Sequence, residues 1–392
     1  MLNENVKQSR RIVIFGAGQI GRQALTMYKG NVKYFIDNDE KLQGTLIDGV
    51  PVKSINAILE DTDDFQIVIA SAYQKSMEQQ LKDLGVENYE LYLEKFKAYY
   101  VTDEIVFNPY VDNPNRDVTE DTWNQYIKNS VKIEMINKEV EEIHNQNKIF
   151  SHVEIETVNR CNGTCEFCPV SKMHDSREYL EMSERLFQDI IEQLAEINYN
   201  GKLALFSNNE PFLDKNIIQK HKYAREKLPN AKMHLFTNGT LLTVDKFVEI
   251  MKYLDELIID NYQQDLKLIK PCKEIESYCM THPEYRRKVT IVLRKPKEIL
   301  STRGGDAPNR REKVSYGNAR CILPYKQLII RPDGKVSLCC NDPLGKNTLG
   351  DLTKSNILDV WNNDRFKMVR ECLYEGRAKW KHCEYCDHFS MG

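Results

Sequence analysis

Alternating apolar and polar runs divide the 392-residue chain into segments of strand and helix length. In the first hundred residues, apolar runs of strand length occur at 11–15, 32–36, 65–70 and 89–93. Helical periodicity fills the intervals 20–29, 54–60 and 74–84. Strands that alternate with helices predict a parallel sheet covered on both faces. We therefore expect an α/β domain over residues 1–100.

Residues 101–150 interrupt this rhythm, because Asn-Pro pairs at 108–109 and 113–114 indicate a linker. An amphipathic helix is expected after it, over roughly 119–147. A second alternation follows, with strands expected at 152–158, 202–207, 232–237, 256–260 and 288–293. The helices between these strands are expected near 183–197, 214–227, 243–253 and 264–280. Repeats at this spacing predict a partial (β/α)6 barrel of the TIM type over residues 151–314.

The tail, residues 315–392, has a different pattern. Two alternating runs within 325–340 flank Pro332-Asp333-Gly334 and predict a β-hairpin. A helix is expected near 355–374, and a short segment with closely spaced cysteines ends the chain. We expect a small separate domain here.

The composition is that of a soluble globular protein, with 41% hydrophobic and 29% charged residues and a formal net charge of −3. No basic cluster dominates, so we expect no nucleic-acid partner. No apolar window reaches the roughly 18 residues of a membrane span, and the first apolar run is too short for a signal peptide. The sequence therefore predicts a cytoplasmic protein with no membrane partner.

Eleven cysteines are present, and none precedes Cys161. In a reducing compartment an odd, uneven set is not a disulfide framework, and tight spacings indicate metal binding. Cys161, Cys165 and Cys168 form a Cys-x3-Cys-x2-Cys loop after the first barrel strand. Three thiolates so close together can hold one iron–sulfur cluster and leave one iron open. Zinc is the alternative, although no fourth ligand stands beside the trio at zinc-like spacing.

This cysteine loop, with Phe167 before its last cysteine, resembles that of the radical SAM superfamily. The resemblance implies a 4Fe–4S cluster whose open iron binds S-adenosyl-L-methionine (SAM), and reductive cleavage of SAM to a 5′-deoxyadenosyl radical that abstracts hydrogen from a substrate. Two later loops match the family in part, and the residues expected to bind SAM are Phe167, Asn208, Asn209, Glu210, Thr237 and Asn238. Asn208 and Asn209 replace the glycines of the family's Gly-Gly-Glu-Pro segment, and asparagine tolerates positive φ better than most residues.

The tail carries a second candidate metal site. Thiolates from the hairpin and from the terminal Cys-x2-Cys could complete a closed site, for which structural zinc competes on spacing alone. The arrangement resembles the SPASM domain of radical SAM enzymes in its shortened twitch form. The resemblance implies an auxiliary 4Fe–4S cluster with the ligands Cys321, Cys339, Cys383 and Cys386. Cys340 is an alternative to Cys339, since neighbouring strand residues face opposite sides and only one of them can ligate.

Gly16-x-Gly18-x-x-Gly21 follows a predicted strand, and Asp37 closes the next one. This context is typical of a Rossmann-like turn, in which glycines allow close approach of a phosphate to a helix N-terminus. Together with the Phe35–Asp39 and Leu46–Val52 segments, the domain resembles the N-terminal domain of sugar acetyltransferases. That resemblance implies a setting in polysaccharide biosynthesis and a nucleotide or nucleotide-sugar ligand.

These patterns together predict a radical SAM oxidoreductase with two 4Fe–4S clusters. The expected substrate is a carbohydrate or nucleotide-linked sugar, dehydrogenated with the auxiliary cluster as electron acceptor and with an external donor such as flavodoxin or ferredoxin. The alternatives are a sugar epimerase, a peptide-modifying maturase and a zinc-stabilised nucleotide-binding scaffold. No catalytic base is identifiable, while Arg294 and Arg303 are candidates for contact with SAM or an anionic substrate.

Overall fold

The computed structural model describes residues 11–18, 21–92, 105–110, 122–146, 148–286, 288–310 and 314–389, apart from positions 23, 26, 27, 29, 72 and 73. Parts of the predicted 20–29 helix, the 113–114 pair and the start of the predicted 119–147 helix therefore lie outside the described residues. The chain forms two compact units, Met1–Val101 and Thr102–Gly392. No helix among the described residues has the length and apolar content needed to cross a bilayer.

The first unit is built on a six-stranded sheet in the order β3-β4-β2-β1-β5-β6. All neighbours pair in parallel except the short β3·β4 hairpin. Its elements are β1 (Arg11–Phe15), β2 (Val32–Ile36), β3 (Leu46–Ile47), β4 (Val50–Lys53), α2 (Ala57–Glu60), β5 (Phe65–Ile69), α3 (Gln74–Asp83) and β6 (Tyr89–Leu91). The central strands place Val13, Ile36 and Ile67 in a buried core. The parallel α/β architecture predicted for this region is confirmed.

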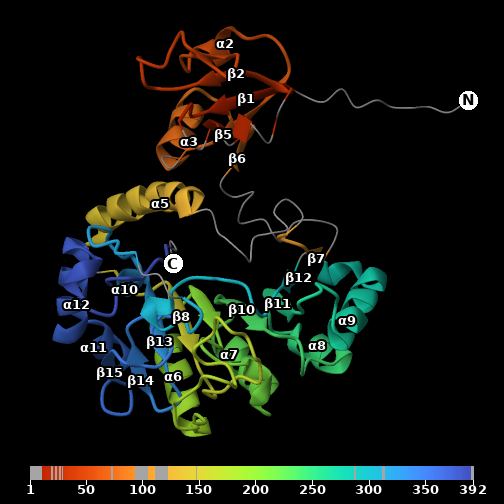
Figure 1. Ribbon diagram of the computed structural model, residues 1–392, viewed down its shortest axis with the longest axis vertical. Helices are drawn as coiled ribbons and strands as arrows, with labels where there is room; N and C mark the ends of the chain where they lie inside the picture. The colour runs from red at the N-terminus through yellow and green to blue at the C-terminus, as the bar shows by residue number, and fades with distance from the viewer. Residues whose placement is uncertain are drawn as a thin grey trace, which may run out of the picture. The chain divides into compact units, whose positions relative to one another are not determined.

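The second unit contains a nine-stranded sheet in the order β15-β14-β13-β8-β9-β10-β11-β12-β7 (Figure 1). From β13 to β7 every neighbouring pair is parallel. The strands are β7 (Val106–Phe107), β8 (His152–Ile155), β9 (Lys202–Ala204), β10 (Lys232–Thr237), β11 (Glu256–Tyr262), β12 (Val289–Arg294), β13 (Gln327–Ile330), β14 (Lys335–Ser337) and β15 (Thr348–Asp351). The order has two ends, so the parallel part is an open, partial barrel.

Helices cover the outer face of this barrel. They are α6 (Glu184–Glu196), α7 (Ile217–Lys227), α8 (Val244–Ile250) and α9 (Lys270–Thr281), and successive members of the series contact one another. Ser183 begins α6 as its N-cap, and its hydroxyl accepts a hydrogen bond from the Leu186 amide. Cys272 and Cys279 are fully buried on α9, as expected of core residues.

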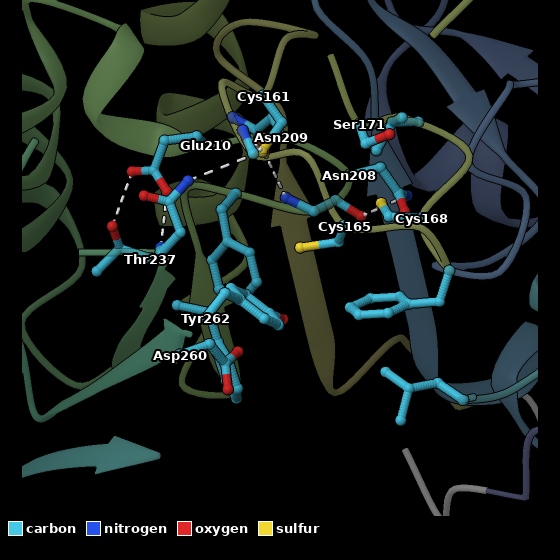
Figure 2. A pocket seen from close by; sticks show the side chains of 18 of the residues that line it. Cys161, Cys165, Cys168, Ser171, Asn208, Asn209, Glu210, Thr237, Asp260 and Tyr262 are labelled. Atoms are coloured by element: carbon cyan, nitrogen blue, oxygen red, sulfur yellow. Dashed lines mark hydrogen bonds between the residues drawn. The ribbon is translucent and has the colours of Figure 1, made fainter. Parts of the chain in front are cut away.

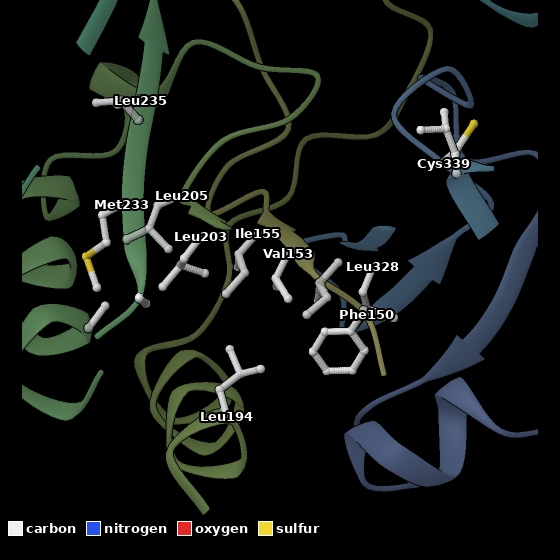
Figure 3. Close-up of a cluster of buried hydrophobic side chains, with 14 of the residues drawn as sticks. Phe150, Val153, Ile155, Leu194, Leu203, Leu205, Met233, Leu235, Leu328 and Cys339 are labelled. Atoms are coloured by element: carbon white, nitrogen blue, oxygen red, sulfur yellow. The ribbon is translucent and has the colours of Figure 1, made fainter. Parts of the chain in front are cut away.

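Strand alternation gives the barrel two different faces. Val153 and Leu203 on neighbouring strands point outward and pack with Leu194 of α6 (Figure 3). Their neighbours point inward, where the rings of His152 and His234 lie 5.3 Å apart. The outer face therefore carries the hydrophobic core, and the inner face carries polar and aromatic groups.

The remaining helices lie around the tail and before β8. They are α5 (Thr122–Ile143), α10 (Leu323–Lys326), α11 (Ile357–Trp361) and α12 (Asp364–Glu375), with single 3-10 turns at Pro211–Leu213, Pro283–Tyr285, Arg303–Gly305 and Arg377–Lys379.

Three sequence predictions need correction. The predicted 355–374 helix is two helices, because Asn363 leaves helical geometry and caps α12 by accepting from the Phe366 amide. The predicted linker contains β7, which pairs with β12 but is too short to show an alternating pattern. The hairpin at 325–340 exists, but its first strand, β13, also pairs in parallel with β8 and extends the barrel sheet.

Candidate active site

The three closely spaced cysteines meet at the carboxyl end of the barrel. The loop after β8 brings Cys161, Cys165 and Cys168 to one wall of a cavity of about 290 Å³ (Figure 2). Backbone hydrogen bonds fix this loop, since the Lys172 amide donates to the Gly163 carbonyl over 2.8 Å. Ligands and chemistry at the carboxyl ends of barrel strands are the rule for this architecture.

The environment of these thiols disfavours their ionisation in the absence of a metal cation. Burial raises the pKa of Cys161 to about 12, although the Gly163 amide donates a hydrogen bond to its sulfur over 3.3 Å. Burial also raises the pKa of Cys165, and the charges of the two other cysteines and of Asp260 act in the same direction. Such a site suits a polycationic metal centre, whose charge stabilises thiolates.

Single-ion binding fits the cysteine geometry poorly. Among the described residues, no three His, Cys, Asp or Glu side chains converge closely enough to hold one metal ion. Tetrahedral zinc with Zn–S bonds of roughly 2.3 Å would bring its sulfurs to about 3.8 Å from one another. A polynuclear cluster spreads its thiolates over a wider perimeter, so the geometry favours iron–sulfur over zinc.

The Asn208-Asn209 segment forms the next wall of the cavity, and its backbone does not need glycine. Neither asparagine has a positive φ, so the tolerance expected from the sequence is not required. The Asn208 amide N–H donates to Glu156 Oε1 over 2.7 Å, and its side-chain Nδ2 donates to the Cys340 carbonyl over 3.2 Å. Asn209 Nδ2 is buried without a hydrogen-bond partner. A buried donor of this kind beside a cavity is suited to a ligand's oxygen atom.

Glu210 joins two of the cavity loops. Its Oε1 accepts from the Phe212 amide over 3.1 Å and from the Thr237 hydroxyl over 2.8 Å. Its Oε2 accepts from the Asn238 amide over 2.8 Å. Both carboxylate oxygens are thus engaged by the protein, and the principal contribution of Glu210 is to hold the loop after β9 against the loop after β10.

Arg177 supports the same wall from behind. Its guanidinium pairs with Asp175 over 3.0 Å and with the buried Glu156 over 3.5 Å. It also donates to the backbone carbonyls of Asn159 and Asn208. This cation therefore stabilises both the cysteine loop and the asparagine loop, and no pattern in the sequence indicated its role.

The cavity is also lined by residues that sequence reasoning did not assign to the site. Phe206, Phe236 and Tyr262 supply aromatic walls, and Asp260 and Ser301 supply polar ones. Asp260 and Tyr262 stand at the end of β11, where the rule of strand carboxyl ends could have found them. Arg303 also lines the cavity, with a left-handed φ of 50°, and donates to Asn208 Oδ1. Arg294 is not among the lining residues, and its Nε lies 2.9 Å from Glu298 Oε1.

Buried polar side chains, among them Glu154 and Gln327, lie on the inner face of the sheet near the cavity. Glu154 is buried and accepts a hydrogen bond from Gln327 Nε2 over 2.9 Å. Burial raises the pKa of Glu154 to about 7, although a hydrogen bond with Ser207 and the charge of Arg303 oppose the rise. Because Ser207 lines the cavity, this carboxyl is one hydroxyl group away from it.

The four tail cysteines gather in a second, closed site. Cys321, Cys339, Cys383 and Cys386 are all buried and free of disulfides. Burial raises the pKa of Cys339 well above its usual value, and the charges of the other three sulfurs contribute to the rise. These residues come from three segments of the tail, and the backbone turn from Cys383 to Cys386 is closed by a 3.0 Å hydrogen bond.

Cys340 neighbours this group, and its charge acts on Cys339, but its own surroundings differ. Its pKa responds, after burial, to the charges of Glu154 and Arg303, which belong to the inner face of the barrel and to the cavity. The Cys340 amide donates to Gln327 Oε1 over 3.1 Å. Both cysteines lie beyond the end of β14 at Ser337, so the strand alternation expected from the sequence does not apply to them. Cys339 is the one whose pKa responds to Cys321, Cys383 and Cys386 together.

A short loop connects the tail site with the cavity. Its Thr302 amide donates to Asp387 Oδ1 over 2.7 Å, and the Thr302 hydroxyl donates to the Tyr385 carbonyl over 2.8 Å. The next residue, Arg303, lines the cavity. A Cβ atom at Gly304 would lie 2.3 Å from His382 Nε2, so a glycine is needed where this loop crosses the tail.

In the first unit, the side chain of Asp37 closes the turn that contains Gly16 and Gly21. Asp37 Oδ2 accepts from the Ala17 amide over 2.6 Å, and Oδ1 accepts from the Asp39 amide over 2.8 Å. Gly16 has a φ of 107°, and a Cβ at Gly21 would lie 1.8 Å from the Gly16 carbonyl oxygen. These two glycines are required by the turn itself, whereas a Cβ at Gly18 would meet open space.

Comparison with known proteins agrees with the two cysteine sites. Residues 155–271 match the radical SAM superfamily, residues 321–387 match an iron–sulfur cluster-binding domain named SPASM, and residues 8–92 match a C2185-like N-terminal domain. The chain is 30% identical over 245 residues to an S-adenosyl-L-methionine-dependent 2-deoxy-scyllo-inosamine dehydrogenase of Niallia circulans, covering 62% of this chain and 95% of that protein.

A solved structure resembles the same region. The crystal structure of BtrN in complex with AdoMet and 2-DOIA superposes with a TM-score of 0.55 and 27% identity, covering 62% of this chain and 95% of that one. The radical SAM and SPASM matches imply 4Fe–4S clusters and SAM as cofactors, as predicted from the cysteine loops. The chain belongs to the radical SAM superfamily.

Proposed function

We propose that this enzyme dehydrogenates a hydroxyl group of a carbohydrate or a related cyclic polyol. The observation that carries the proposal is the pairing of two cysteine sites in one unit, one at a cavity and one closed. The relative that matches along 95% of its length is named as the dehydrogenase of an amino-cyclitol, and the similarity extends over 245 residues of this chain. Loss of two electrons from an alcohol needs a second electron acceptor, which a closed cluster can provide.

The residues at the cavity fit the first cofactor pair. Three thiols face the same space and no fourth cysteine lines it, which suits a cluster with one open iron. We assign Cys161, Cys165 and Cys168 as its ligands. When bound, this cluster and SAM supply the electron and the radical that removes hydrogen from the substrate. Asn209 Nδ2, which has no hydrogen-bond partner among the residues that the structure describes, is suited to an oxygen atom of SAM.

The chain's own contribution is to position ligands and exclude water. Glu210 holds the Thr237 and Asn238 loop at the cavity, so these three residues place SAM by shaping its wall. Phe167, Phe206 and other aromatic side chains give the cavity apolar walls, which protect a reactive radical from solvent. Arg303 offers a guanidinium to the substrate's oxygen atoms.

The tail cysteines fit a cluster that exchanges electrons but binds no substrate. Cys321, Cys339, Cys383 and Cys386 provide four thiols in a buried site, and we assign them as the ligands of the auxiliary cluster. The loop at Thr302 and Arg303 joins this site to the cavity. The electrons for SAM cleavage come from an external donor such as flavodoxin or ferredoxin.

The first unit is proposed to bind a nucleotide or nucleotide-sugar. The support is its parallel sheet and the tight turn at Gly16 and Gly21, above which Gly18 leaves space. Both carboxylate oxygens of Asp37 accept hydrogen bonds from backbone amides. Asp37 therefore stabilises the turn and is not assigned to the ribose of a nucleotide. Isothermal titration with UDP-sugars tests this role, and binding that is unchanged by Gly18→Phe would contradict it.

The deciding experiment is turnover by the reduced, iron-loaded enzyme with a panel of cyclitols, sugars and nucleotide-sugars. We expect substrate-dependent 5′-deoxyadenosine and an equal amount of ketone product, with deuterium carried from a labelled carbinol carbon. An epimer with solvent deuterium at that carbon would indicate an epimerase. Modification of a peptide without stimulation by any polyol would indicate a maturase, and either result rejects the proposal.

A further inference from the structure

One arginine in the tail is buried without an acidic partner. Arg377 is 1% exposed and is among the largest fully buried side chains of the described residues. Its Nη1 donates to the Cys386 carbonyl over 2.6 Å and its Nη2 to the His388 carbonyl over 2.8 Å. Its guanidinium carbon lies 4.1 Å from the centre of the Phe389 ring. Burial of a charge is costly unless another charge compensates it.

The charges that can compensate Arg377 are those of the tail cysteines once they bind a metal centre as thiolates. The groups whose negative charge favours the protonated form of Arg377 are Cys321, Cys386, Cys383 and Cys339, which are the proposed cluster ligands. Among the described residues no carboxylate forms an ion pair with Arg377, and Asp387 nearby pairs with Arg310 over 3.2 Å. The positive charge of Arg377 is therefore directed at the cysteine group.

The cavity site has the opposite charge pattern. After burial and the neighbouring sulfurs, the groups that act on Cys165 are the carboxylates of Asp260 and Glu298. Glu210 acts on Cys161 in the same way. The cavity site also has a largely buried cation beside it, because the charge of Cys168 acts on Arg177. Arg177, however, pairs with Asp175 and Glu156, whereas no carboxylate among the described residues pairs with Arg377.

We propose that Arg377 is a positioning and electrostatic residue that raises the reduction potential of the auxiliary cluster. Addition of one electron makes a cluster one charge more negative, and a fixed cation in a poorly screened interior stabilises that state. Arginine suits this role because it stays protonated in proteins. The inference rests on the proposed function, since it requires a cluster at the tail cysteines.

A purely structural role for Arg377 is the alternative explanation for its burial. Its hydrogen bonds connect Cys386 and His388 and so hold the terminal turn in place. Charge and hydrogen bonding can be separated by substitution. Arg377→Lys keeps the positive charge with a poorer set of donors, whereas Arg377→Gln keeps a donor and removes the charge.

The test is an anaerobic redox titration followed by EPR, in the full chain with Cys161, Cys165 and Cys168 replaced by alanine, so that only the auxiliary cluster contributes. We expect Arg377→Gln to lower the reduction equilibrium constant at least tenfold, which is about 59 mV for a one-electron couple. Arg377→Lys should stay within threefold of the parent. Equal potentials in the parent and Arg377→Gln, with full iron content, would overturn the proposal.

Arg370 provides a matched control. It is a half-buried cation of the same region that donates to the Pro324 carbonyl over 2.9 Å and lies over the Trp361 ring. No cysteine is among the groups that shift its pKa. Arg370→Gln should leave the potential unchanged. An equal fall in this variant would assign the effect to general loosening of the domain.

A second variant covers the case in which Arg377→Gln loads too little iron. Arg377→Met removes the charge and keeps an unbranched side chain of similar length beside the Phe389 ring. The proposal expects a lower potential here as well, and an unchanged potential overturns it. Absence of any auxiliary cluster from the parent protein would instead reject the proposed function.

Discussion

The two cysteine sites of the second unit differ in openness and in charge. The three cysteines after β8 line a cavity and have the carboxylates of Asp260 and Glu210 in their surroundings. The four tail cysteines are buried around one another and face Arg377. The number of thiols and the openness of the site therefore separate a centre that can bind a ligand from one that only exchanges electrons.

The two sites also differ in how the chain assembles them. Cys161, Cys165 and Cys168 come from one loop that is positioned by a single strand end. The tail group needs the segments around Cys321, Cys339 and Cys383 to pack together, with hydrogen bonds such as those from Thr302 to Tyr385 and Asp387. A local site depends on one loop, whereas an assembled site depends on the fold of its domain.

Removal of one ligand from each site tests whether the two sites have different roles in the reaction. Cys165→Ala should lower SAM cleavage by about a thousandfold or more, equivalent to ~4 kcal/mol, because the open iron is lost. Cys383→Ala should keep SAM cleavage but form no ketone, because the electron acceptor is lost. Quantification of 5′-deoxyadenosine and ketone in both variants checks this, and equal loss of both products in Cys383→Ala would show that the sites do not divide the reaction.

The next prediction distinguishes the adjacent cysteines. Cys339→Ser should lose the auxiliary cluster, roughly four irons per chain, because its sulfur faces the other tail cysteines. Cys340→Ser should retain that iron, because its sulfur faces Glu154 and Arg303. Iron analysis of anaerobically reconstituted protein gives the answer, and the reverse pattern would exchange the two assignments.

The pH dependence of stability tests the environment of Glu154, a buried residue of the inner face whose charge acts on Cys340. The pKa of Glu154 rises from 4.5 to about 7 through burial, against the charge of Arg303 and with that of Glu156. His152, 3.5 Å away, has its pKa lowered to about 3 by burial and stays neutral. A carboxyl with a raised folded-state pKa stabilises the fold below pH 4.5 and loses that contribution as the pH passes 7.

We therefore expect this group to lower the free energy of unfolding by up to about 3 kcal/mol between pH 5 and pH 8. Glu154→Gln should remove that fall. Urea denaturation of the metal-free chain at the two pH values measures it. A dependence that is the same in parent and variant would show that Glu154 does not titrate in this range.

The smallest effect is expected at Glu210, which shapes the cavity without ligating metal. Glu210→Gln should weaken SAM binding about thirtyfold, since the hydrogen bonds that the carboxylate accepts from the Asn238 and Phe212 amides are weakened by ~1 kcal/mol each. Iron content should stay unchanged. Glu249→Gln, at an exposed carboxylate paired with Lys252, is the control and should bind SAM as the parent does.

Features that depend on residues close together in the sequence were predictable, whereas features that depend on distant segments were not. The cysteine loop and the residues Glu210, Thr237 and Asn238 were predictable, because each follows directly after a strand whose apolar pattern is clear. Asp260 obeys the same rule but was not assigned, since no motif draws attention to it. The tail ligands were assigned through resemblance, because residues as far apart as Cys321 and Cys386 give no spacing signal.

Features that depend on tertiary packing could not be predicted from the sequence. Arg377 stands in a basic segment that reads as exposed, yet the fold buries it against four sulfurs. The end of α11 and the start of α12 at Asn363 were hidden because both helices share one continuous amphipathic pattern. The pairing of β13 with β8 joins segments that are far apart in the chain, which periodicity cannot reveal.

The most direct test of the divided roles is EPR of the reduced protein with and without SAM. The account predicts two cluster signals, of which one changes when SAM binds and disappears in the Cys161, Cys165 and Cys168 alanine variant. The second signal should be indifferent to SAM and should disappear in Cys383→Ala. A single signal in the parent protein, or two signals that both respond to SAM, would contradict the account.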